Sequence, residues 1–450
     1  MAPLSNRLSR WTLPLFAAAL ANFLAAQGLM LSGASWPWQS ASADGTLATV
    51  HLLVIGWLLL LMLGALFQFV PVITSRALPS QRLVLATFIA IELGLAGMVC
   101  GFFSLGHSTA LTLALPVGGS AVVLGVALAL YNLSVPLLGT RALGLPGRMV
   151  LTGALFLALT VVLGLTFALA FAVPALTLHL APLLYALGDH ALAGLGGWFT
   201  LSAMGVSYKL LPMFMLAPED RGLTGDVVHV LATLGFVLAI GAGLVRAWAA
   251  APWLRVAQSS GEIAIVIAVA IFLGDILNLY RARQRALIET HNRAALGAFA
   301  MLGLTAVLAI GLLIAGRLAR EAPLLVYLAV FGWLGGLGLT QLYKVVPFLT
   351  WLSRYGPRLG REAVPRVQDL VEESRGQPWF ALYFLAVLLA GAALLLNDTR
   401  GLRAALALVA LATLGLIREY WRAWRAYYPS RSRAHDVPRT SSPITEVDHG

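Results

Sequence analysis

Long apolar runs, separated by short polar segments, follow one another along almost the whole chain. A membrane-spanning helix needs about 20 predominantly apolar residues, and the chain contains twelve runs of that kind between its Gly, Pro and Arg breakers. Their approximate bounds are 11–33, 47–74, 82–104, 109–132, 148–172, 190–215, 225–248, 258–280, 293–316, 323–352, 378–397 and 402–425. The pattern therefore predicts an all-α polytopic membrane protein with twelve transmembrane helices.

The composition agrees with this prediction and narrows the chemistry. Of the 450 residues, 60% are apolar and 11% are charged, and the mean hydropathy is +0.86. Soluble domains are about 45–50% apolar and about 25% charged, which excludes a water-soluble enzyme. We expect a single membrane domain over 1–425. The lone cysteine, Cys100, excludes an internal disulfide and a thiolate metal cage, so a metal or haem would need His, Tyr, Met or carboxylate ligands.

The net charge of +11 comes from arginines that lie mostly between the apolar runs. Topology explains their placement better than nucleic-acid binding, because cytoplasmic loops of membrane proteins are enriched in Arg and Lys. We expect a bacterial-type inner-membrane protein with both termini cytoplasmic and a polar, disordered tail over 426–450. The arginines assigned to the inner loops are Arg76, Arg82, Arg141, Arg148, Arg281, Arg283, Arg285, Arg293, Arg354, Arg358, Arg361, Arg366 and Arg375.

One pattern occurs three times: Gly-Trp, thirteen further residues, then Pro. The copies lie 141 and 135 residues apart, in the second, sixth and tenth predicted helices. Self-similarity at such spacing indicates repeated structural units. We therefore expect three pseudo-symmetric four-helix units, approximately 11–135, 148–280 and 293–425, each placing its second helix at the centre. The copies are Gly56-Trp57 with Pro71, Gly197-Trp198 with Pro212, and Gly332-Trp333 with Pro347.

Within each copy, a stripe of side chains lies on one side of the helix. At about 100° per residue, Trp, the residues seven and eleven later, and Pro lie within about 40° of one line. Position seven is Gly64, Gly205 or Thr340, and a small residue there favours close approach of a neighbouring helix.

Position eleven holds Gln68 or one of the only two lysines, Lys209 and Lys344. Each lysine either reaches the headgroups or acts in an anion, acid or proton pathway, for which Asp275 and Glu92 are the available carboxylates.

The grouping of twelve spans into three fours resembles the large subunit (subunit I) of the haem-copper oxidase and nitric-oxide reductase superfamily. The stretch from His51 through Gly56 and Trp57 to Pro71 resembles its second helix, where a histidine near the outer face ligates low-spin haem. The NnrS family of membrane proteins has similar histidine-led helices. The resemblance covers 11–425 and implies a subunit I-like fold with His51 as a haem ligand.

The chain departs from the oxidase ligand set in three places. The tenth helix has Tyr327 and no histidine, and His190 is followed at the fourth position by Gly194 instead of tyrosine. The family's His-His pair after the seventh helix is absent, and His229 stands alone near the inner end of the seventh predicted helix. We therefore do not expect a standard terminal oxidase, and enzymatic activity is left open with a non-enzyme favoured.

The candidate cofactor ligands follow from these positions. His51 is the first and His190 the second, for haem or copper, and Tyr327 is the repeat equivalent of His51 and a possible axial ligand. His179 could join His190 in a metal site at the outer face. The competing interpretation is that these side chains make ordinary hydrogen bonds at the outer margin.

Three functions fit the sequence. The first is a haem-binding protein, with copper as a further metal, linked to respiratory-chain components, nitric-oxide response or cofactor handling. The second is a cofactor-free transporter or permease whose polar pathway residues are Lys209, Lys344, Asp275 and Glu92. The third is a structural or assembly partner of a respiratory complex.

Overall fold

The structure is a computed structural model that describes residues 10–40, 42–218, 223–249 and 251–426. The predicted tail over 426–450 lies, apart from its first residue, outside the described residues. Among the described residues, eleven helical stretches are long and apolar enough to cross a membrane. They are α1 (Thr12–Ser32), α2 to α3 (Asp44–Thr74), α4 (Gln81–Phe103), α5 to α6 (Thr109–Leu138), α7 (Leu145–Ala172), α11 (Leu223–Arg246), α12 (Pro252–Arg281), α13 (Thr290–Ile314), α14 to α15 (Ala322–Arg354), α16 (Glu373–Leu396) and α17 (Thr399–Arg425).

The remaining predicted span, 190–215, is also helical. Here α9 (Leu187–Ala191), η4 (Leu192–Thr200) and α10 (Leu201–Met215) follow one another without a break. The short α8 (Pro174–Leu180) and η3 (Ala181–Ala186) connect it to α7. The prediction of an all-α polytopic membrane protein is confirmed, because every apolar run marked on the sequence is a helix with bounds shifted by at most six residues.

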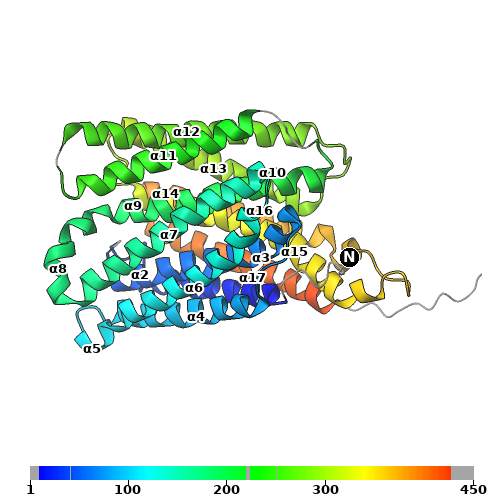
Figure 1. The fold of residues 1–450 in the computed structure, drawn as a ribbon, viewed down its shortest axis with the longest axis horizontal. Coiled ribbons are helices and arrows are strands. Elements are labelled where there is room, and N and C mark those ends of the chain that lie inside the picture. Colours follow the sequence, from blue (N-terminus) through cyan, green and yellow to red (C-terminus); the bar gives the residue numbers. More distant parts are fainter. Residues whose placement is uncertain (1–9, 41, 219–222, 250, 427–450) are drawn as a thin grey trace, which may run out of the picture.

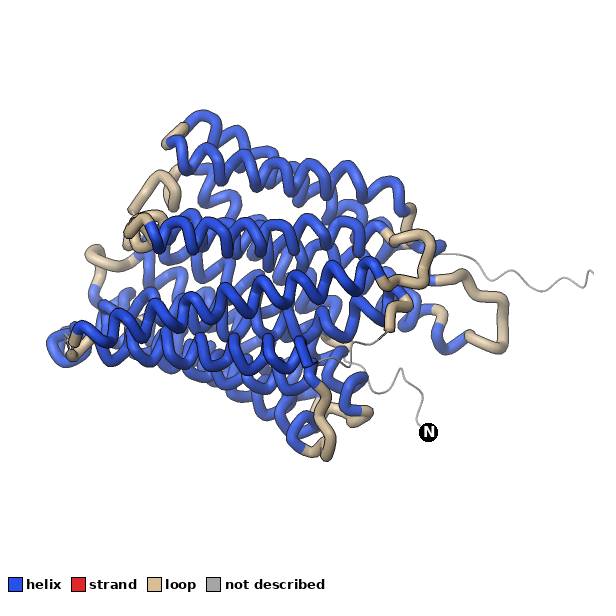
Figure 2. Tube along the Cα trace, turned by 90° about the horizontal axis from the view of Figure 1, so that it is seen from above, coloured by secondary structure: helices blue, strands red, loops and turns tan. Residues whose placement is uncertain are grey.

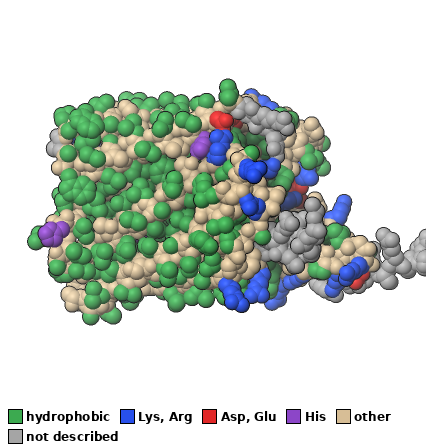
Figure 3. All heavy atoms as spheres, viewed as in Figure 1, with side chains coloured by type: hydrophobic (Ala, Val, Ile, Leu, Met, Phe, Trp, Pro, Cys, Tyr) green, Lys and Arg blue, Asp and Glu red, His purple; other side chains and the backbone are tan. Residues whose placement is uncertain are grey.

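The helices run roughly parallel to the long axis, and their connections gather at two ends (Figures 1 and 2). One end holds the loops 75–80, 139–144, 282–289 and 355–372, together with the start of α1 and the close of α17. Figure 3 shows that Lys and Arg side chains gather at one end while the flank is mainly hydrophobic. We call this the arginine-rich end and the opposite one the far end.

Each Gly-Trp pair lies in a π-helical segment, a wider turn that is rare and often found at functional sites. These segments are η2 (Leu52–Leu59), η4 and η5 (Leu328–Gly335), and all three contact one another. The indoles of Trp57, Trp198 and Trp333 are fully buried. The repeat found in the sequence therefore marks the three helices that meet at the centre of the bundle.

The same set of contacts recurs around this centre. The helices α1, α7 and α13 pack on η2, η4 and η5, and the pairs α4 with α6, α11 with α12, and α16 with α17 form hairpins. The last helix of each predicted unit contacts the first helix of the next, since α6 packs on α7, α12 on α13, and α17 on α1. The helices thus form a closed ring around the three central ones.

Close packing explains the glycines of the repeat stripe. A Cβ on Gly64 would lie 2.8 Å from Phe16 of α1, and one on Gly205 would lie 2.8 Å from Met149 of α7. The predicted stripe therefore does face a neighbouring helix, α1 for Gly64 and α7 for Gly205. At position eleven, the Gln68 amide nitrogen donates to the Thr12 hydroxyl at 2.5 Å, where α1 begins.

Candidate functional site

The three central helices leave a cavity of about 120 Å³ between them. Its lining includes the same three positions of all three repeats, one, five and eight residues after each tryptophan. The lining is apolar apart from Ser207 and Gln341. We call it the axial cavity, and its repeated positions are Leu58, Phe199 and Leu334, then Met62, Ala203 and Gly338, then Ala65, Val206 and Gln341.

The three tryptophans directly precede the first lining position of each repeat. The Trp333 Nε1 donates to the Thr200 hydroxyl at 3.3 Å, across to the second central helix. The Trp57 ring lies against the third central helix, 3.5 Å from where a Cβ on Gly338 would stand. Among the described residues, Nε1 of Trp57 and of Trp198 has no hydrogen-bond partner. The central helices are thus interlocked by their indoles just beyond the cavity.

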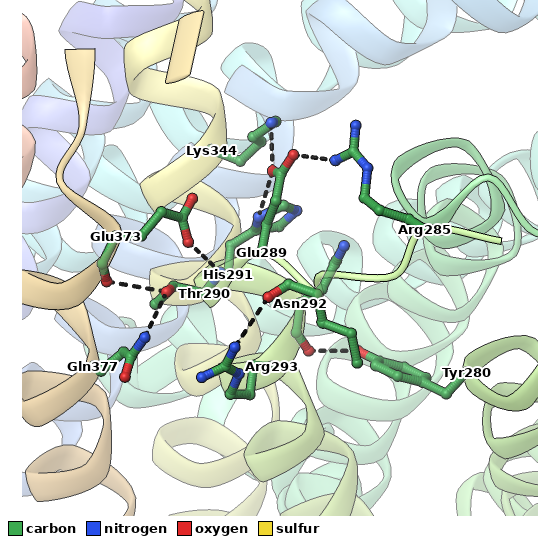
Figure 4. Close-up of polar contacts among 11 residues, drawn as sticks. Tyr280, Arg285, Glu289, Thr290, His291, Asn292, Arg293, Lys344, Glu373 and Gln377 are labelled. Carbon is green, nitrogen blue, oxygen red and sulfur yellow. Dashed lines mark hydrogen bonds and ion pairs between the residues drawn. The ribbon is translucent and has the colours of Figure 1, made fainter. Parts of the chain in front are cut away.

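A charged cluster lies toward the arginine-rich end (Figure 4). The Lys344 ammonium donates to Glu289 Oε2 at 2.5 Å, Arg285 donates to Glu289 Oε1, and His291 Nδ1 lies 3.3 Å from Oε2. The side chains of Lys344 and Glu289 are only 18% and 12% exposed. The Lys344 ammonium also lies over the Phe214 ring, 5.8 Å from its centroid.

Glu289 stays ionised in this setting. Burial alone would raise its pKa, but the hydrogen bond and charge of Lys344, together with the charges of His291 and Arg285, hold the pKa below its ordinary value. Because the carboxylate sits just before α13, it also lies where the helix dipole favours negative charge. The Glu289 carboxylate therefore binds the cationic side chains of Arg285, in the same loop, and Lys344, in α15.

Further polar contacts join the helix ends around Glu289. The Thr290 amide donates to Glu373 Oε2 at 2.5 Å, and the Thr290 hydroxyl donates to the Glu373 carbonyl at 3.0 Å. The Tyr280 hydroxyl donates to the Asn292 carbonyl at 2.6 Å. These bonds fix the start of α13 against α12 and α16.

The predicted carboxylates have other partners. Asp275 is buried and accepts from the Tyr208 hydroxyl at 2.7 Å. Glu92 accepts from the Asn22 amide at 2.9 Å, and Asn22 also donates to the Gly56 carbonyl at 3.5 Å. In the described structure the ion-pair partner of Lys344 is Glu289, not Asp275 or Glu92, the two carboxylates that the sequence offered for the pairing alternative.

The sequence did not indicate Glu289 as the partner of Lys344, because Glu289 lies in a short loop, 55 residues away. Its position directly before a helix, near Arg285, was the one available signal.

Lys209 lies elsewhere, lining a second cavity of about 290 Å³ at the arginine-rich end with Tyr208 and the start of α7.

The candidate histidines lie toward the far end. His51 Nδ1 is 2.7 Å from the Leu47 carbonyl, and its ring lies 4.7 Å from that of Phe102. The His190 ring lies 5.5 Å from that of Phe167, and its buried Nδ1 has no partner among the described residues. His179 is exposed on α8. His179 is therefore on the surface, whereas the Nδ1 of His190 is buried.

Haem does not fit between His51 and Tyr327. The Tyr327 ring stacks on Phe331 at 4.9 Å and lies 5.9 Å from Trp36, while Phe23 stacks on Trp57 at 4.7 Å. Phe23 also lies 5.5 Å from Phe331. These rings occupy the space between the first and third central helices that a porphyrin would need.

A larger metal cage is also not present in the described part of the chain. No group of three or more His, Cys, Asp or Glu side chains there could hold a metal ion. Of the candidate ligands proposed from the sequence, His51 and His190 remain as donors for a metal.

No protein-family model matches the chain, and no curated protein matches its sequence.

Proposed function

We propose that the protein is a cofactor-free permease whose pathway runs between the three central helices. The axial cavity is the observation that carries this proposal, because equivalent positions of all three repeats line it. In the sequence, the three tryptophans directly precede its first lining positions, and Lys344, the partner of Glu289, directly precedes the lining residue Val345. Ionisable groups at membrane depth are expensive and commonly mark pathways.

The cavity limits the solute that such a pathway would pass. A volume of about 120 Å³ holds a molecule of only a few heavy atoms. Its apolar lining would not compensate an ion for the loss of water, which costs many kcal/mol for an isolated charge. The solute class is therefore small and uncharged, and the charges of Lys344 and Glu289 stay paired with each other.

The proposal includes the architecture and orientation. The chain forms three pseudo-symmetric four-helix units around the central helices, in the manner of oxidase subunit I, and the arginine-rich end faces the cytoplasm of an inner membrane. Reporter fusions after residues 45, 185 and 320 are expected to report the outer side. A cytoplasmic signal at any of them would overturn the orientation.

Solute flux tests the permease directly. Proteoliposomes containing the full chain are expected to swell faster than empty liposomes in stopped-flow light scattering with formamide or urea as the probe. Filling the axial cavity with Gly338→Leu and Ala65→Phe should remove the difference, whereas Leu411→Phe on the lipid-facing side of α17 should not. Equal swelling of protein-containing and empty liposomes for both probes would overturn the proposal.

A second candidate is a metal site at His51 and His190. The Nδ1 of His51 is held by a backbone carbonyl, as in most ligating histidines, which leaves Nε2 to bind a metal such as copper. The buried, unpartnered Nδ1 of His190 is the other available donor. Metal analysis and oxidised and reduced optical spectra of the purified protein decide this. A metal or Soret signal lost in His51→Ala and kept in His179→Ala would favour cofactor handling with respiratory partners over the permease.

A further inference from the structure

The exposed face of α17 changes from apolar to basic and aromatic toward the arginine-rich end. Leu411 and Leu414 are 49% and 51% exposed, as expected for side chains that face lipid tails. The same stripe continues, at spacings of three and four residues, with Arg418, Trp421 and Arg425. Trp421 is 49% exposed. Since Trp and Arg concentrate where acyl chains meet headgroups, this change marks the headgroup level of the bilayer.

The basic side chains here are held by aromatic rings. The Arg425 guanidinium lies 3.9 Å from the centroid of Trp421, and the Arg354 guanidinium, from the end of α15, lies 5.8 Å from that of Trp424. Arg354 also donates to the Ala426 carbonyl at 3.1 Å. Stacking on an aromatic face leaves the hydrogen-bond donors at the edge of a guanidinium available.

No carboxylate neutralises three of these arginines in the part of the chain that the structure describes. Glu419, the nearest acid in sequence, pairs with Arg422 at 2.6 Å. No ion pair there involves Arg354, Arg418 or Arg425. The stripe therefore presents unneutralised positive charge at the depth where lipid phosphates lie.

We propose that Arg354, Arg418, Trp421, Trp424 and Arg425 form a binding site for the headgroup of an anionic phospholipid. Guanidinium groups bind phosphate oxygens through paired, charge-assisted hydrogen bonds. The acyl chains of the same lipid would lie along Leu411 and Leu414, which is why a lipid, and not free phosphate, is the occupant. The site is independent of the permease function and of the axial cavity.

Native mass spectrometry of the full-length protein in detergent tests the site. The protein is titrated with dioleoyl phosphatidylglycerol, with the zwitterionic phosphatidylcholine of the same chains as the comparison. Each arginine at the headgroup level contributes about fivefold in affinity. The Arg418→Gln/Arg425→Gln variant should therefore bind phosphatidylglycerol about 25-fold more weakly, while phosphatidylcholine binding should stay unchanged.

A matched control removes the same charge elsewhere at the same end. Arg82 and Arg361 are both exposed, and Arg82→Gln/Arg361→Gln should bind phosphatidylglycerol within about twofold of the original chain. Equal weakening in both double variants would overturn the site, because it would mean general attraction to the arginine-rich end. Equal binding of the two lipids, or displacement of the lipid by equimolar inorganic phosphate, would also overturn it. Circular dichroism confirms that the variants are folded.

Discussion

The first and third central helices each contact a neighbouring helix through a polar side chain at the same repeat position, but one contact is neutral and the other is charged. Eleven residues after its tryptophan, each presents a long polar side chain to the start of a neighbouring helix, α1 or α13. Gln68 meets the Thr12 hydroxyl, and Lys344 meets the Glu289 carboxylate. The fold therefore needs a polar bridge at this position, and a charged pair is an addition specific to the third repeat.

Removing the acid from the charged bridge should have the largest effect. Glu289→Gln leaves the largely buried Lys344 without its counter-charge. Breaking a fully buried pair costs about 3–5 kcal/mol, and the partial exposure here lowers our expectation to about 2–3 kcal/mol. The measurement is thermal unfolding of the detergent-solubilised protein. An unchanged unfolding midpoint would show that the two bridges are energetically alike.

Acid should remove the same stabilisation in the unmodified chain. The pKa of Glu289 is depressed in the folded protein, so its contribution is complete above its ordinary value of 4.5 and is lost as the pH falls through the folded pKa. The difference in unfolding midpoint between the original chain and Glu289→Gln should be constant from pH 7 to pH 5 and shrink below about pH 4.5. A difference that grows on acidification would contradict the assignment of the charge.

Replacing the charged bridge by the neutral one should recover most of the loss. Lys344→Gln combined with Glu289→Thr copies the Gln68 and Thr12 pair into the third repeat. A neutral hydrogen bond contributes about 0.5–1.5 kcal/mol. The free energy of unfolding of the double variant should therefore lie within about 1 kcal/mol of that of the original chain. If it is no better than Glu289→Gln alone, the surroundings of Arg285 and His291 require the carboxylate itself.

The neutral bridge should matter least. Gln68→Leu removes the bond to Thr12 while keeping most of the side-chain volume, and we expect a loss of about 1 kcal/mol. The same unfolding assay measures it, with Gln68→Glu as a comparison that places a carboxylate at this position. A loss as large as that of Glu289→Gln would mean that both bridges carry similar weight and that charge is not what distinguishes them.

Hydropathy predicted the helices because burial in lipid requires long apolar runs. The tryptophan repeat identified the three central helices from the sequence alone. The partner of Lys344 was not predictable in the same way, since Glu289 lies in a loop and no helical spacing relates the two. The aromatic packing around Tyr327 was also hidden. Phe23, Trp36 and Phe331 come from separate segments, and only the tertiary structure shows that their rings fill the space next to it.

Ring closure has a consequence for how the chain can be cut. Because α17 packs on α1 just as α6 packs on α7 and α12 on α13, the ring is closed by three contacts of the same kind, and the backbone crosses only two of them. The start of α1 and the close of α17 lie at one end of the bundle. A circular permutant opened at 139–144, with a flexible linker joining 425 to 12, should therefore insert and fold with every interhelical contact retained.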